Sequence, residues 1–79
     1  MSAAEITPRI ETVFSRVFGP RTPFAIELSR VNETRWNSLR HMELLVGLEQ
    51  EFGIRFDGAD ATDMTSIAEV IERVRSKLE

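Results

Sequence analysis

Apolar residues recur at helical spacing in three separate stretches of the chain. The first stretch follows the i, i+3, i+4, i+7 pattern over about three turns, with Ile6, Ile10, Val13, Phe14, Val17 and Phe18 as its apolar positions. Gly19 and Pro20 come directly afterwards, and both residue types commonly end helices. The pattern predicts a first helix that ends near Phe18.

A long connection of Pro, Thr, Ser, Asn and Arg residues follows at positions 19–36. Four apolar residues are set among the polar ones: Phe24, Ile26, Leu28 and Val31. A loop of this length is unusual in a small domain. We expect it to lie over the core through these four side chains, and a brief strand-like or helical turn near residues 24–28 fits the pattern.

The second helix is predicted from Ser38 to Phe52, with Gly53 as the left-handed residue that commonly ends a helix. At 100° per residue its apolar positions form a broad arc: Leu39, Met42, Leu44, Leu45, Val46, Leu48 and Phe52. Such an arc is wider than one packing neighbour requires. We therefore expect part of it, around Met42 and Val46, to face a partner or a cargo.

The remaining residues predict an extended piece at Ile54–Phe56, a turn at Asp57-Gly58, one short helical turn over Asp60–Met64 and a last helix. Ser66 and Glu69 have the spacing of a capping box, in which each side chain bonds to the other residue's backbone amide. Helical spacing continues at Ile67, Val70, Ile71, Val74 and Leu78. The expected fold is an all-α single domain over residues 1–79. It has three main helices, one short helix and a long loop between the first two.

Composition narrows the function classes. A 79-residue domain buries too little surface to favour a deep catalytic cleft. Its net charge of −3 gives no excess of cations to neutralise phosphates, which argues against nucleic-acid binding. No apolar run approaches the length of a membrane span, and the first residues lack a signal-peptide pattern. We expect a cytoplasmic protein and, by default, a monomer.

Ser38 is the main candidate for chemistry. Serine is a preferred residue at or beside a helix cap, so by itself it is weak evidence of function. The same helix end also favours a phosphate, because unpaired amides and the positive end of the helix dipole point at it. Both explanations stay open on these grounds alone.

The segment around Ser38 resembles the prosthetic-group segment of acyl carrier proteins. The matching residues read Asn37-Ser38-Leu39, then Leu48-Glu49-Gln50-Glu51-Phe52-Gly53-Ile54, and similarity covers about residues 36–78. Trp36 and His41 suggest a free-standing branch with a Trp-Asp/Asn-Ser-Leu-x-His motif. The resemblance implies a carrier that catalyses nothing itself and holds an acyl or aminoacyl thioester on a 4′-phosphopantetheine attached to Ser38.

The resemblance also implies partners and a docking surface. The partners would be a phosphopantetheinyl transferase, which uses coenzyme A, an acyl- or aminoacyl-loading ligase, and downstream acyl-using enzymes. The docking residues implied are Leu39, Met42, Glu43, Val46, Gly47 and Glu49. An unmodified helical interaction domain with the same fold is the alternative.

Three residues depart from the family pattern. Asn37 replaces the usual aspartate before the serine, and Arg40 and Gln50 stand where many fatty-acid carriers have acids. The acidic docking face is thereby reduced, which favours dedicated partners in a specialised pathway.

Other polar residues have ordinary explanations. We expect a packing or surface role for His41, with hydrogen bonding to the arm as the alternative, and Trp36 as a hydrophobic plug.

No catalytic constellation is evident. The aspartates at 57, 60 and 63 lack the spacing of a calcium loop, so we expect turn formation and no metal. The cations at 73, 75 and 77 suit a helix C-terminus. Leu45, Ile67 and Ile71 could shelter a cargo, although core packing suits them better.

Overall fold

The computed structural model describes residues 2–79 and places them in four α-helices: α1 (Ala3–Phe18), α2 (Ser38–Phe52), α3 (Gly58–Asp63) and α4 (Ile67–Leu78). Within this range there is no sheet, and one isolated antiparallel bridge pairs Ser29 with Ser66. The predicted all-α fold of three main helices and one short helix is confirmed. None of these helices has both the length and the apolar character needed to cross a membrane.

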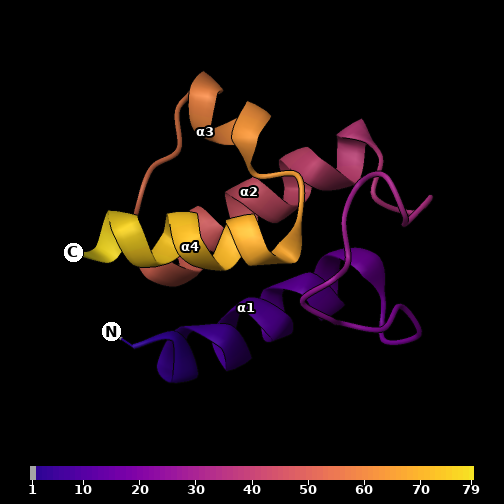
Figure 1. The fold of residues 1–79 in the computed structure, drawn as a ribbon, viewed down its shortest axis with the longest axis horizontal. Coiled ribbons are helices and arrows are strands. Elements are labelled where there is room, and N and C mark those ends of the chain that lie inside the picture. The colour runs from indigo at the N-terminus through magenta and orange to yellow at the C-terminus, as the bar shows by residue number, and fades with distance from the viewer. Residues whose placement is uncertain (1) are drawn as a thin grey trace.

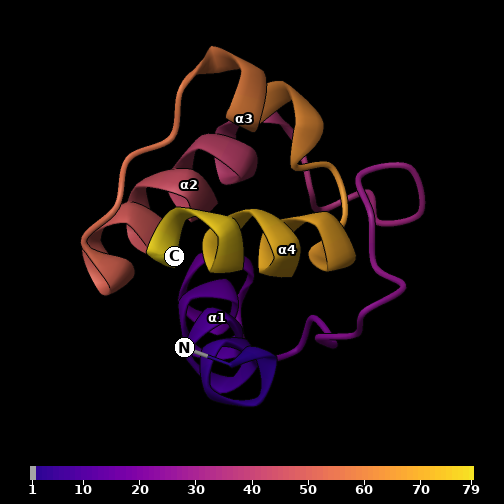
Figure 2. The same ribbon diagram turned by 60° about the vertical axis from the view of Figure 1, so that its left-hand side comes forward.

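The start of α2 lies at the same end of the molecule as the long loop. In Figure 1, α1 runs from left to right, whereas α2 and α4 run from right to left. The loop of residues 19–37 connects α1 to α2 at the right-hand end of that view. Figure 2 shows the same order from another side, with α3 beyond α2 on the side away from α1.

The helix ends follow the local chemistry of the sequence. Gly19 ends α1 with a φ of 91°, and Gly53 ends α2 in the left-handed region at φ 66° and ψ 37°. Ser66 caps α4 by accepting the backbone N–H of Glu69 at 3.2 Å. The second half of the expected capping box is wrong, because the Glu69 carboxylate accepts hydroxyl protons from Ser66 and Thr65 instead of the Ser66 amide.

The short helix α3 begins two residues earlier than predicted. Asp57 and Asp60 form a reciprocal capping box across its first turn, which fixes its start at Gly58. The Asp60 carboxylate is buried and pairs with Arg73 at 2.7 Å and with Lys77 at 2.8 Å. These two cations tie α4 to α3, so complementing the dipole of α4 is not their whole role.

The core lies where α1, α2 and α4 meet. Its buried apolar residues are Ile6, Ile10, Val13, Phe14, Phe18, Trp36, Leu44, Leu45, Leu48, Met64, Ile67, Val70 and Val74. Phe24 and Leu28 pack against this core from the long loop, as predicted. Ile26 and Val31 do not, since they are 56% and 96% exposed. Ile26 and Val31 both lie in turns of the loop, and their side chains face solvent.

Candidate functional site

Ser38 is the first residue of α2, and its hydroxyl does not cap the helix. The cap is Asn37, whose Oδ1 accepts the backbone N–H of Arg40 at 2.9 Å. The explanation of Ser38 as an ordinary cap therefore does not hold. Ser38 is exposed, which leaves its oxygen open to a reacting partner.

Arg30 reaches the Ser38 hydroxyl from the long loop. Its Nη2 donates to the Ser38 Oγ at 3.4 Å. The backbone N–H of Arg30 donates to the Thr65 carbonyl at 2.9 Å, which fixes this part of the loop beside the start of α4. No sequence pattern predicted the contact, because no periodicity relates an irregular loop to a helix eight residues further on.

The start of α2 is electropositive. Its first intrahelical hydrogen bond runs from the His41 N–H to the Asn37 carbonyl at 2.9 Å, so the N–H groups of Ser38 and Leu39 lie at the open end of the helix. The first turn contains no acidic residue. The open amides, the helix dipole and Arg30 together favour an anionic group on the Ser38 oxygen.

His41 and Trp36 hold this helix start against the rest of the molecule. Both are buried, and the Trp36 Nε1–H donates to His41 Nδ1 at 3.0 Å. His41 Nε2 lies 2.7 Å from the Ala61 carbonyl, to which it donates when Nδ1 is the acceptor. Trp36 is thus the hydrophobic plug that was expected. The packing role of His41 is also confirmed, since both of its ring nitrogens are bonded within the protein.

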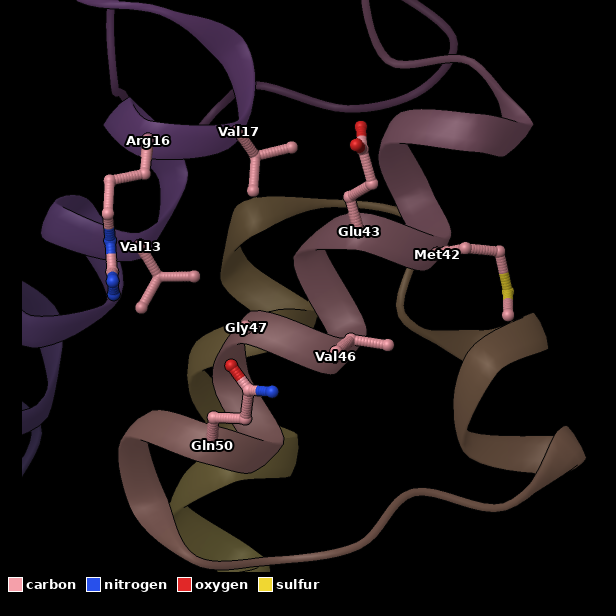
Figure 3. Close-up of a pocket in the computed structure, with 8 residues that line it drawn as sticks. All are labelled: Val13, Arg16, Val17, Met42, Glu43, Val46, Gly47 and Gln50. Carbon is pink, nitrogen blue, oxygen red and sulfur yellow. The ribbon is translucent and has the colours of Figure 1, made fainter.

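The predicted docking residues do not all share one environment. Leu39, Met42 and Val46 are exposed by 69%, 57% and 46%, and Glu43 is exposed beside them. Figure 3 shows Met42 and Val46 projecting from α2. They separate a groove of about 430 Å³ that α2 forms with α1 from a second groove of about 390 Å³ beside α3.

Gly47 and Glu49 have contacts inside the molecule. Gly47 faces α1, and a Cβ added there would lie 2.7 Å from Val13 Cγ1, so this glycine lets the two helices approach. Glu49 accepts the Phe56 backbone N–H at 2.8 Å and thereby holds the segment after α2. Neither residue belongs to the row of exposed apolar side chains formed by Leu39, Met42 and Val46.

The three residues considered for cargo shelter are packed. Leu45 and Ile67 are buried in the core, and Ile71 is partly buried against it. Leu45 also lines the groove that α2 forms with Phe56 and the start of α3. The hollow beside Leu45 therefore opens toward α3 and not toward α4.

No protein-family model matches the chain. Among solved structures, the chain is similar to the holo acyl carrier protein from Geobacter metallireducens, determined by solution NMR. The TM-score is 0.71 at 26% sequence identity, and the match covers 96% of this chain and 84% of that one. The fold is therefore that of an acyl carrier protein, and the likeness supports a carrier role in general.

Proposed function

We propose that the chain is a carrier that bears 4′-phosphopantetheine on Ser38 and presents an acyl or aminoacyl group to partner enzymes. The main support is the exposed Ser38 hydroxyl at the start of α2, in a fold similar to that of a holo acyl carrier protein. When bound, the arm supplies a thiol that holds its cargo as a thioester. The pathway is proposed to be specialised, because Arg40 and Gln50 replace acids of the usual docking face.

The residues around Ser38 suit a phosphodiester at that position. Asn37 satisfies the Arg40 amide, so the hydroxyl is not needed for capping. Arg30 is already within reach of the oxygen that would carry the phosphorus. The open amides of the first turn add the favourable field of a helix start. The protein's part is thus to hold the phosphodiester beside the Arg30 guanidinium while the arm extends into solvent.

The proposed docking surface follows α2 from the attachment point. Leu39, Met42 and Val46 supply exposed apolar contacts, and Glu43 supplies a charge among them. Gly47 and Glu49 would contribute indirectly, by setting the distance to α1 and the path of the next segment. A transferase, a loading ligase and acyl-using enzymes would bind this surface in turn, through transient contacts of small area.

Intact mass tests the proposal directly. The protein is incubated with coenzyme A and a broad-specificity phosphopantetheinyl transferase. The wild type is expected to gain one phosphopantetheinyl group, and Ser38→Ala none. Ser76→Ala, which alters an exposed serine of α4, is the matched control and should gain the group as the wild type does.

Two results would contradict the carrier proposal. One is an equal gain by Ser38→Ala. The other is no gain by either the wild type or Asn37→Asp with several transferases, which would favour an unmodified interaction domain. If only Asn37→Asp gains the group, the attachment site stands and Asn37 determines which transferase accepts the chain.

A further inference from the structure

Three arginines gather at the start of α2. Arg30 contacts the Ser38 hydroxyl, and the Arg40 Nη1 donates to the Arg35 carbonyl at 3.1 Å. We name Arg30, Arg35 and Arg40 the arginine cluster. Glu33 pairs with the cluster through Arg35, at 4.0 Å. Among the ion pairs of the described residues, this is the one that includes an arginine of the cluster, in a chain whose net charge is −3.

The position of the arginine cluster is electrostatically unfavourable in the free protein. A helix N-terminus carries a partial positive charge, so nearby cations destabilise it and nearby anions stabilise it. The neutral Asn37 cap and a first turn without acids leave Glu33, through Arg35, as the acid paired with the cluster. The phosphodiester proposed on Ser38 would compensate part of this positive charge, and carboxylates of a partner would gain from the remainder.

Exposed apolar side chains accompany the arginine cluster. Leu39 lies between Ser38 and Arg40, and Val31 follows Arg30 in the loop. A mixture of arginine and apolar contacts is typical of protein interfaces, where arginine is enriched. A small inorganic anion would gain nothing from the apolar side chains. The composition therefore favours a protein surface that offers both carboxylates and apolar groups.

We propose that the enzymes which dock over Ser38 present carboxylates to the arginine cluster and an apolar side chain to Leu39. This rests on the proposed function, because the arm is what brings enzymes to Ser38. The charge preference is opposite in sign to that of the acidic docking face described above for acyl carrier proteins. Glu43, one turn further along α2, limits the basic region to the end that surrounds the attachment point.

Two matched helical peptides test the preference. Both have leucine along one face, and one carries glutamate and the other lysine at all polar positions. Each is titrated into ¹⁵N-labelled unmodified protein at about 50 mM and about 300 mM salt, conditions that differ in electrostatic screening. The glutamate peptide is expected to bind at least about fivefold more tightly at low salt and to shift the amides of Arg30, Leu39 and Arg40.

Variants identify the groups responsible. Arg30→Glu/Arg40→Glu should reverse the preference, and Arg30→Gln/Arg40→Gln should abolish it without adding a new charge. Arg55→Glu, a single reversal at the other end of α2, should leave the preference in place. Circular dichroism establishes that each variant is folded.

Several outcomes would overturn the inference: equal or tighter binding of the lysine peptide, no amide shift with either peptide, or an unchanged preference in both double variants. The mass measurement on Ser38 is independent of the titration. Failure of both the wild type and Asn37→Asp to gain the arm disproves the carrier proposal, whatever the peptides show. A chain that gains the arm but lacks the glutamate preference disproves only the docking inference.

Discussion

The starts of α2 and α3 share a capping geometry but differ in charge. Asn37 caps α2 and Asp57 caps α3, each by accepting the backbone N–H of the third helical residue. In α3 that residue is Asp60, whose carboxylate accepts the Asp57 N–H in return. In α2 it is Arg40, which has no acceptor to offer. A reciprocal pair of hydrogen bonds closes the first turn of α3, whereas the cap of α2 consists of the single bond from the Arg40 N–H to Asn37.

The difference extends to the surroundings of the two helix starts. Two cations of α4, Arg73 and Lys77, bind the Asp60 carboxylate, so the charge at α3 links two helices. At α2, Arg30 contacts the exposed Ser38 hydroxyl and Arg40 donates to the Arg35 carbonyl, and the ion pair here is the one between Arg35 and Glu33. This difference is the one expected if the start of α3 serves the fold and the start of α2 serves a partner, as proposed.

Removing the Asp60 charge should have the largest effect on the fold. Asp60→Asn weakens two ion pairs and the reciprocal cap of a buried carboxylate, so we expect it to lower the free energy of unfolding by about 2 kcal/mol. Urea denaturation measures the loss. The control is Asp63→Asn, an exposed partner of Arg73, which should cost less than about 0.5 kcal/mol. Equal costs for the two variants would contradict the structural role of Asp60.

Acid should weaken the same link. The hydrogen bond from Lys77, followed by that from the Asp57 amide, lowers the pKa of Asp60 from 3.8 to about 2. A carboxyl whose pKa is lower in the folded state stabilises the fold above its unfolded pKa, and this contribution is lost as pH falls toward the folded pKa. Unfolding free energy should therefore decrease between about pH 4 and about pH 2. Urea titrations over this window should show a smaller slope for Asp60→Asn, and parallel slopes would contradict the assignment.

Local sequence patterns were sufficient for most of the fold. The bounds of α2 and the end of α1 were predicted because apolar periodicity stops at Gly53 and Gly19, which supply the backbone geometry of a helix end. The start of α3 was placed too late, because aspartate spacing alone did not distinguish a turn from a reciprocal cap. Ile26 and Val31 were misassigned to the core, since an irregular loop has no period that indicates which side chains face inward.

The candidate site was predictable only where it lies on a helix. Ser38 and the exposed positions Met42 and Val46 follow from the start and arc of α2, although their function stays a prediction. Arg30 was missed, because its approach to Ser38 depends on the bridge that pins the loop beside α4. Such a contact depends on tertiary structure, which neither spacing nor composition encodes locally.

The smallest effect should be a gain in stability at the open helix start. Arg40 is the third residue of α2, where glutamate would suit the helix dipole and could accept the Asn37 N–H as in a capping box. We expect Arg40→Glu to raise the free energy of unfolding by about 0.5 kcal/mol, even with the exposed hydrogen bond to the Arg35 carbonyl lost.

Arg55→Glu is the control, because a cation just beyond the end of α2 is favourable, and its reversal should lower stability slightly. Urea denaturation at low salt measures both variants. A loss of stability in Arg40→Glu would mean that Arg40 serves the fold, as Asp60 does at α3. A gain would mean that the native arginine lowers the stability of the free protein, which is expected of a residue kept for a partner.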